Sequence, residues 1–404
     1  LLYLQVYHHY RNLITARKLL PGSRMPSLRK CSQELQLSRT TVENAYLQLA
    51  AEGYIISKAQ SGYYVTDIAT KEPLPRQTEK PSLPPCRYDL SSSGVDRESF
   101  RFDLWQRYLK SALRQNQRLL TYGEPQGEAD FRQALSDYVY QKRNIACSPD
   151  DIVVGAGVQS LLQILCPLIR DKKTVSFPTP SFIQGSTVFS DFGFQVRYRN
   201  RRLELIRYAA EHKSLIIEDD FENEFVYLQK PTPSLFSLSG GHDVVYIGSF
   251  SRLLLPSIRV SFMILPPGLS EAYRKKSEYY NQTASKAEQI ALCQFIRDGH
   301  LSAQTRRLKR LYSAKLKELL STVRETFGTD CSIQIGAAGT SLALTLPCQA
   351  DGASVKKAAR LLGLRLTVLK EDPSAITLLL SCSSMPTGDF RPACGLLKQV
   401  IDSF

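Results

Sequence analysis

The sequence predicts an α/β protein in which a small N-terminal domain of three helices and a β-hairpin is followed by a larger domain. Three observations predict this. The first 65 residues pass from helical to strand patterns, prolines then gather at positions 73, 75, 81, 84 and 85, and short apolar runs afterwards alternate with amphipathic stretches. We place the N-terminal domain at 1–68, a proline-rich linker at 69–88 and the large domain at 89–404, with a smaller C-terminal α+β subdomain from about 290.

Composition excludes several classes of protein. With 43% hydrophobic and 22% charged residues, the 404-residue chain has ordinary globular composition. No run approaches the roughly 18 apolar residues of a membrane span, and we see no secretory signal. The nine cysteines include no Cys-x-x-Cys, and the five histidines lack metal-ligand spacing. We therefore expect a cytoplasmic protein with reduced thiols and no metal site.

The N-terminal elements follow from periodicity and capping residues. Apolar positions predict a first helix from residue 4 that ends near Pro21-Gly22. Ser27 begins a second helix, and Ser38 is a favourable N-cap for a third that continues through Leu49. Strands are predicted at 53–56 and 63–65 around a turn that contains Ser61-Gly62. Three helices followed by such a hairpin describe a winged helix-turn-helix.

Charge in this small domain favours nucleic acid as its partner. Residues 1–65 contain eight basic and three acidic residues, and such an excess of positive charge is what phosphate binding requires. The second helix of the motif enters the major groove with its first residues, and the start of the preceding helix reaches phosphates. The alternative is a protein-interaction winged helix with incidental charge. The DNA-binding candidates are Ser27, Arg29, Lys30, Ser38, Arg39, Thr40, Thr41 and, in the wing, Gly62.

The stretches 21–29, 37–42 and 45–54, together with Gly62, cover most of the N-terminal domain. In these stretches the domain closely resembles the GntR-type regulators. The resemblance implies DNA binding through Arg29, Arg39 and Thr41, with the Gly62 turn as a wing at the minor groove.

The large domain has the alternation that is typical of a mostly parallel sheet covered by helices. Buried strands are predicted at 152–154, 174–177, 214–217 and 244–247, and helices at 161–168 and 203–211. The chain is predicted to be helical from about 278, before two further strands at 341–346 and 376–380.

Four stretches of this large domain, 122–127, 155–159, 217–220 and 248–251, are followed by Arg259. In these stretches the domain resembles the fold-type I, aspartate-aminotransferase-like pyridoxal-phosphate enzymes. A GntR-type head on such a body is the arrangement of the MocR/GabR-type transcription regulators. The resemblance implies a homodimer and a pyridoxal-phosphate pocket in each body.

The residues of these stretches also have chemistry of their own. A Gly-Ala-Gly turn that opens a helix leaves backbone N–H groups that can hold a phosphate, although such a turn alone is often purely structural. Hydroxyls and a guanidinium add donors, and a carboxylate at Asp219 keeps a pyridine nitrogen protonated. The candidate cofactor or effector residues are Gly157, Val158, Gln159, Phe182, Asp219, Phe221, Ser249, Ser251, Arg252 and Arg259.

Several of these positions depart from the enzyme pattern. The Schiff-base lysine of the family falls at Arg252, its cofactor-contacting tyrosine at Phe221, and its stacking ring at Phe182. Gln184 stands where relatives often carry an arginine, and 378–384 contains none. Arginine stays protonated and cannot form an imine. We therefore expect no transamination, and either non-covalent binding of pyridoxal phosphate or a different anionic effector.

The chain also departs from the family in length. Relatives have a few dozen residues where this sequence passes from Asn200 to Arg201, including one strand of the sheet. Loss of a core strand is costly. We expect that a segment is missing from this numbering at that point.

Together these features predict a bacterial DNA-binding transcription regulator whose degenerate aminotransferase-like domain dimerises and senses a small ligand. Its partners would be double-stranded operator DNA, a small effector and a second copy of the chain. Two alternatives remain: a pyridoxal-phosphate aminotransferase with an accessory DNA-binding head, and a body that only dimerises without sensing a ligand.

Overall fold

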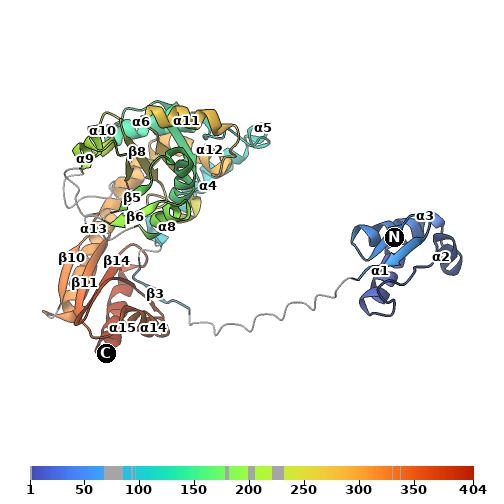
Figure 1. Cartoon of the computed structure of the whole chain (residues 1–404). Coiled ribbons are helices and arrows are strands. Elements are labelled where there is room, and N and C mark those ends of the chain that lie inside the picture. The colour runs from blue at the N-terminus through green and yellow to red at the C-terminus, as the bar shows by residue number, and fades with distance from the viewer. Residues whose placement is uncertain are drawn as a thin grey trace. The chain divides into compact units, whose positions relative to one another are not determined.

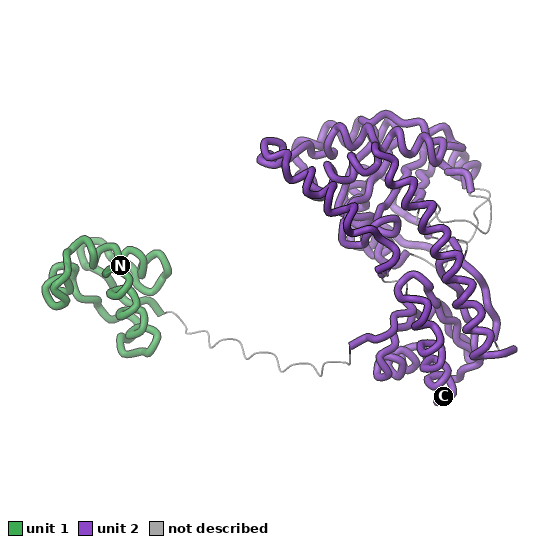
Figure 2. The backbone as a smooth tube through the Cα atoms, turned by 180° about the vertical axis from the view of Figure 1, so that it is seen from behind, with its two compact units in different colours: residues 1–82 green, residues 83–404 purple. Residues whose placement is uncertain are grey.

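A computed structural model describes residues 2–67, 85–91, 94–95, 97–177, 182–198, 205–220, 232–329, 331–336 and 338–404. The chain divides into two compact units, residues 1–82 and 83–404, as Figure 2 shows. Of the predicted linker, positions 69–84 lie outside the described residues. Among the described residues, no helix is long and apolar enough to cross a membrane.

The first unit has the predicted order of elements. It contains α1 (Leu2–Thr15), α2 (Leu28–Leu35), α3 (Arg39–Ala51), β1 (Ile55–Lys58) and β2 (Gly62–Val65). The prediction that the first helix ends near Pro21-Gly22 is wrong. Helix α1 ends at Thr15 because the chain beyond it turns and pairs with β2, where the Gly22 and Met25 amides donate to the carbonyls of Val65 and Tyr63.

An aromatic core holds this unit together. Tyr46 of α3 is fully buried, contacts the ring of Tyr10 edge-on and donates its hydroxyl to the carbonyl of Pro26 at 3.1 Å. The Tyr10 hydroxyl lies 3.3 Å from the buried Cys31 sulfur of α2. Thus all three helices pack on one cluster, which fixes the angle between α2 and α3.

The second unit contains one four-stranded sheet in the order β4-β9-β8-β7. Strands β7 and β8 are parallel, and β9 runs antiparallel to both of its neighbours, so β4, β7 and β8 share one direction. Strands β5 and β6 form a separate parallel pair. The bounds are β4 (Ile152–Gly155), β5 (Thr174–Phe177), β6 (Gln195–Tyr198), β7 (Ile216–Asp219), β8 (Val244–Ser249) and β9 (Ser261–Ile264).

The predicted α/β architecture is confirmed, with corrections in detail. The strand predicted at 214–217 is β7, two residues later, because the Ile216 amide begins the ladder by donating to the carbonyl of Asp243. Helix does not begin at 278. Helix α12 begins at Lys286, where Ser285 caps it, and the preceding 281–284 segment bonds other loops instead.

Helices cover the sheet on both sides (Figure 1). The helices of this part of the unit are α4 (Phe102–Leu113), α5 (Asn116–Leu119), α6 (Ala129–Arg143), α7 (Val158–Leu165), α8 (Ile183–Asp191), α9 (Leu205–Glu211), α10 (Leu235–Leu238), α11 (Pro267–Ser277) and α12 (Lys286–Arg297), of which α4 packs on α12 and α5 lies away from the strands.

The small subdomain is an antiparallel sheet in the order β10-β11-β14-β13 with two helices. A short strand from the start of the unit, β3 (Tyr88–Asp89), pairs with β12 of this subdomain. The bounds are β10 (Ser332–Ile335), β11 (Ser341–Pro347), α14 (Gly352–Leu361), β12 (Leu364–Arg365), β13 (Thr367–Asp372), β14 (Ala375–Ser381) and α15 (Phe390–Asp402).

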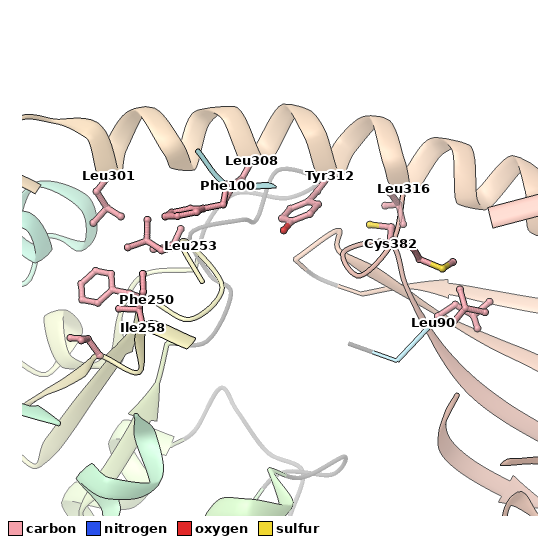
Figure 3. Packing of buried hydrophobic residues seen from close by; sticks show 14 of the residues in the cluster. Leu90, Phe100, Phe250, Leu253, Ile258, Leu301, Leu308, Tyr312, Leu316 and Cys382 are labelled. Carbon is pink, nitrogen blue, oxygen red and sulfur yellow. The ribbon is translucent and has the colours of Figure 1, made fainter. Parts of the chain in front are cut away.

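One long helix, α13 (His300–Phe327), connects the two parts of this unit. In Figure 3 its N-terminal half packs over Phe250 and Leu253 of the large part, and its C-terminal half packs over Leu90 and Cys382 at the small subdomain. The buried hydrophobic residues on both sides belong to one cluster, so the helix is shared between the two cores.

Candidate DNA-binding and anion-binding sites

The start of α3 presents the predicted DNA-reading residues. The Ser38 hydroxyl accepts from the Thr41 amide at 3.1 Å, which makes Ser38 the N-cap, and it also lies 2.7 Å from the Thr41 hydroxyl. Arg39 and Thr40 are exposed in the first turn, where their side chains are available to a groove.

The start of α2 carries the candidate phosphate contacts. Ser27 caps this helix by accepting from the Lys30 amide at 3.2 Å, and Arg29 is exposed. Lys30 makes an exposed pair with Glu34 at 3.8 Å, a contact too weak to prevent phosphate binding.

Two basic residues that were not among the predicted DNA contacts, Arg24 and Lys58, lie beside the wing turn. Gly62 has φ of 97°, which favours glycine, and a Cβ there would lie 3.7 Å from the Arg24 guanidinium. Arg24 bridges to Tyr64 of β2, and Lys58 lies 4.6 Å over the Tyr64 ring. The pairing of 22–25 with β2, which places Arg24 beside the wing, is a long-range contact that local patterns do not reveal.

In the large unit, the candidate anion-binding residues lie at one edge of the sheet. Strand pairing places Gly155, Ser261 and Ser249 in one row across β4, β9 and β8. The Ser249 hydroxyl accepts from Ser261 at 3.0 Å and lies 3.3 Å from the Ser251 hydroxyl. Because β4 and β8 end here, this edge is where open α/β sheets bind ligands.

Helix α7 begins at the same edge, and the side chain of Arg259, from a different segment, lies beside its N-terminus. Gly157 has φ of 98°, and a Cβ on it would lie 2.3 Å from the Arg259 guanidinium. Arg259 is exposed and donates to the Ala156 carbonyl at 3.2 Å. The first amides of α7, at Val158 and Gln159, have no acceptor within the helix. The helix terminus and the guanidinium therefore favour an anion at the same place.

The turn before α7 is held by a residue that the sequence did not indicate. Thr283 accepts from the Ala156 amide at 3.0 Å and lies 2.8 Å from the Ser160 hydroxyl. The segment that precedes α12 thereby fixes the conformation of the Gly-Ala-Gly turn.

Asp219 ends β7, next to β8 at this edge. The residue is solvent-exposed. Desolvation and the neighbouring Asp220 charge raise the pKa of Asp219 to about 6. Asp220 itself pairs with Arg143 at 2.8 Å and accepts from the Tyr246 hydroxyl at 2.6 Å. Of the two carboxylates, Asp219 is therefore the one that faces solvent at the end of its strand.

The ring of Phe182 precedes α8 and packs against Gly185, where a Cβ would lie 2.5 Å from it. Gln184 is exposed on the first turn of α8. Phe221, and the passage from Asn200 to Arg201, lie outside the described residues.

Unlike the other candidate residues, Arg252 has its described hydrogen bonds with residues near the small subdomain. Its Nη1 donates to the Gly94 carbonyl at 3.4 Å and to the Ser383 hydroxyl at 3.2 Å. It lies between the large part of the unit and the small subdomain.

Known protein families match both the N-terminal domain and part of the large domain. Residues 2–65 match bacterial regulatory proteins of the gntR family, and residues 96–204 match aminotransferase class I and II. The chain is 31% identical to the uncharacterized HTH-type transcriptional regulator YdeL of Bacillus subtilis, over 82% of this chain and 81% of that protein. It is 26% identical to the probable rhizopine catabolism regulatory protein MocR of Rhizobium meliloti, over 84% and 80%. The chain belongs to the MocR/GabR-type transcription regulators.

The body of this MocR/GabR-type regulator has the fold of an aminotransferase. An archaeal alanine:glyoxylate aminotransferase superposes with a TM-score of 0.70 at 16% identity, over 78% of this chain and 91% of that one. The Pyrococcus horikoshii kynurenine aminotransferase gives 0.67 at 16% identity, over 78% and 90%. These similarities establish the fold alone.

The regulator is shorter than its relatives within the aligned region. The alignment with YdeL has 379 positions, but only 82% of the 404 residues of this chain, about 330, take part in it. Several tens of aligned positions thus have no counterpart here, in line with the expectation that relatives are longer. Within the described residues, the β5–β6 pair and the β4-β9-β8-β7 sheet are separate, and β6 and β7 flank the position where we expect the missing segment.

Proposed function

We propose that this regulator binds double-stranded operator DNA through residues 1–68 and senses a small anion in residues 89–404. GntR-type helix-turn-helix regulators bind DNA, and the exposed Arg29, Arg39 and Thr40 are the residues that we assign to that contact. The effector is pyridoxal phosphate, held without a covalent bond, or another anion with a similar shape.

The observation that carries this proposal is the Arg259 guanidinium at the N-terminus of α7. A charged donor, free backbone amides and the hydroxyls of Ser249 and Ser251 come together at one sheet edge. A phosphate accepts hydrogen bonds from all three kinds of donor.

The remaining residues fit pyridoxal phosphate as a ligand and not as a catalyst. The Asp219 carboxylate is suited to a protonated pyridine nitrogen, and Phe182 offers a ring face. When bound in an enzyme, this coenzyme withdraws electrons from an amine substrate. By the family resemblance Arg252 stands at the position of the bond-forming lysine, and an arginine does not form that imine bond, so the chain binds and orients the group only. A relative at 25% identity, over 90% of this chain and 87% of its own, is the HTH-type pyridoxine biosynthesis transcriptional regulator PdxR of Corynebacterium glutamicum. Its name supports a vitamer-like effector.

We also propose that the body forms a homodimer through exposed apolar residues. Leu120, Tyr122 and Tyr279 are 86%, 96% and 80% exposed. Gln282 donates to the Pro125 carbonyl at 3.0 Å, which brings the Tyr279 segment beside the Tyr122 segment. Such a patch is typical of an interaction site. Sedimentation of the full chain should show a dimer that Tyr122→Glu dissociates. A monomeric wild-type protein would contradict this assignment.

The effector proposal is tested by titrating the full chain with pyridoxal phosphate. We expect saturable binding, a higher melting temperature and no covalent trapping by borohydride. The Arg259→Gln variant should fold and lose most of this binding, because its guanidinium is replaced by a neutral amide. Unchanged binding in that variant would refute the assigned site.

The same titration is repeated with labelled operator DNA. An effector that changes operator affinity or DNA bending supports sensing, whereas footprints that are identical under all tested vitamers and amino acids would favour a dimerisation scaffold. Transaminase turnover would contradict the proposal and support the enzyme alternative.

A further inference from the structure

The exposed face of α3 continues beyond the residues that we assign to DNA. The buried residues of this helix are Val42, Ala45, Tyr46 and Leu49. Its exposed residues are Arg39, Thr40, Glu43, Asn44, Leu47 and Ala51. Glu43 follows Arg39 by four residues and Thr40 by three, so it lies next to them on the same face. We propose that the Glu43 carboxylate reads a cytosine in each operator half-site by accepting a hydrogen bond from its N4 amino group. This role depends on the proposed binding of operator DNA.

Glu43 differs from the other acidic side chains of its basic domain in having no internal partner. Residues 1–65 contain three acidic residues, and two of them are paired. Glu34 pairs with a lysine of α2 at 3.8 Å, and Glu52 accepts from a tyrosine hydroxyl of α1. The Glu43 carboxylate has no hydrogen bond or ion pair with any residue that the structure describes. On a face that approaches a polyanion, such a carboxylate repels phosphates unless a donor of the DNA itself satisfies it.

The position of Glu43 in α3 suits contact with a base edge. Arg39 is the first residue of the helix and Glu43 is the fifth, within the first turns that a recognition helix presents to the major groove. The rise per residue places Glu43 roughly 6 Å beyond Arg39 along the axis, enough to reach a different base pair. In that groove guanine, thymine and adenine all present acceptors, which repel a carboxylate, whereas cytosine presents only its N4 donor. A carboxylate here therefore selects cytosine.

The next turn of the same face also has the chemistry of base contacts. Leu47 follows Glu43 by four residues and is 54% exposed. An apolar side chain at this place matches the C5-methyl group of thymine, which is the apolar feature of the major groove. A face that met only phosphates would be expected to carry cations and hydroxyls throughout. The change from Arg39 to a carboxylate and then to an apolar side chain therefore favours contact with base edges.

Selection of DNA from a randomised duplex library by the full-length protein tests this role. Wild type should enrich a motif with a cytosine at one position of each half-site. Glu43→Gln should shift that position toward adenine, because a glutamine amide bonds both N6 and N7 of that base, and Glu43→Ala should leave the position unselected. The preference at this position should change by about tenfold. Enrichment at the other positions shows that the variants fold and bind.

Glu34→Gln is the matched control, because it removes one exposed negative charge from the same domain. Both glutamine variants should bind non-operator DNA more tightly, since each reduces the repulsion of phosphates, but Glu34→Gln should keep the wild-type motif. A motif that neither Glu43 variant alters overturns the role of Glu43. A change confined to the position that Arg39→Ala also alters overturns direct reading, since Glu43 would then only position Arg39. If wild type enriches no motif, the proposed operator binding fails together with this role.

Discussion

A buried lysine on α13 gives a prediction whose magnitude follows from the structure. Lys315 is 1% exposed, and its ammonium donates to the Met385 carbonyl at 2.8 Å. Desolvation lowers the pKa of Lys315 to about 8, and the nearby Cys382 sulfur offsets this only in part. The unfolded chain keeps the ordinary value of 10.5. The difference of about 2.5 pH units corresponds to about 3 kcal/mol.

The sign of the pH dependence follows from which state holds the proton. Below pH 8 both states are protonated, and the folded protein bears the full cost of a buried charge. Between about pH 8 and 10.5 the folded state releases the proton while the unfolded state retains it, so stability rises with pH. We expect the free energy of unfolding of wild type to rise by up to about 3 kcal/mol relative to Lys315→Met across this window.

Urea unfolding at several pH values measures this effect, with the fluorescence of Trp105 as reporter. Trp105 is the single tryptophan and is buried in the same unit as Lys315. The slope against pH is the observable, because the offset at pH 7 also contains the lost hydrogen bond to Met385. Lys317→Met removes an exposed lysine two residues away and should stay parallel to wild type. Parallel curves for wild type and Lys315→Met would refute a desolvated ammonium.

Three further predictions concern the binding sites. Arg39→Ala should weaken operator binding. If Arg39 contacts a phosphate, the salt dependence of binding should fall by about one charge, and if it contacts a base, about 1–3 kcal/mol of binding free energy should be lost at one operator position. Unchanged binding in filter assays would contradict both. Gly157→Ala should reduce pyridoxal-phosphate affinity at least tenfold, since the added Cβ displaces Arg259. Gly193→Ala controls for backbone strain, because Gly193 also has a positive φ but has open space around it. Equal losses of affinity in the two variants would contradict the displacement. Asp219→Asn should raise the melting temperature by an amount that grows from about pH 4 to pH 6 and then levels off, because between these pH values the unfolded state loses a proton that the folded carboxyl keeps; a gap that does not grow with pH would contradict this.

The order of elements in the N-terminal domain could be predicted, since its signals are local, whereas the end of the first helix at Thr15 could not. Ser27 and Ser38 cap helices as their positions indicate, and the turn at Gly62 needs the φ that glycine favours. What the sequence did not reveal arises from pairing between distant segments. The reversed strand β9 and the placement of Arg24 beside the wing both depend on such pairing.

In the large unit the sequence shows which chemical group stands at each position, but it does not show which distant residues that group contacts. The substitution at Arg252 is visible in the sequence, yet its contacts with Gly94 and Ser383 join segments far apart in the chain. The burial of Lys315 was missed for a related reason. A lysine in a charged amphipathic helix is expected to face solvent, and only the packing of α13 under the loop at Met385 reverses that expectation.

The length of α13 limits how the body can change shape. A helix of 28 residues is a rod of about 42 Å that neither stretches nor shortens, and it is anchored in both cores. Relative motion of the small subdomain is therefore a rotation about this rod or a tilt of it, not a separation along it. A tilt of about 5° displaces the far end of such a rod by about 4 Å, comparable to the rise of more than two helical residues. A small tilt of α13 where it packs in one core would therefore produce a larger displacement at the outer end of the other core.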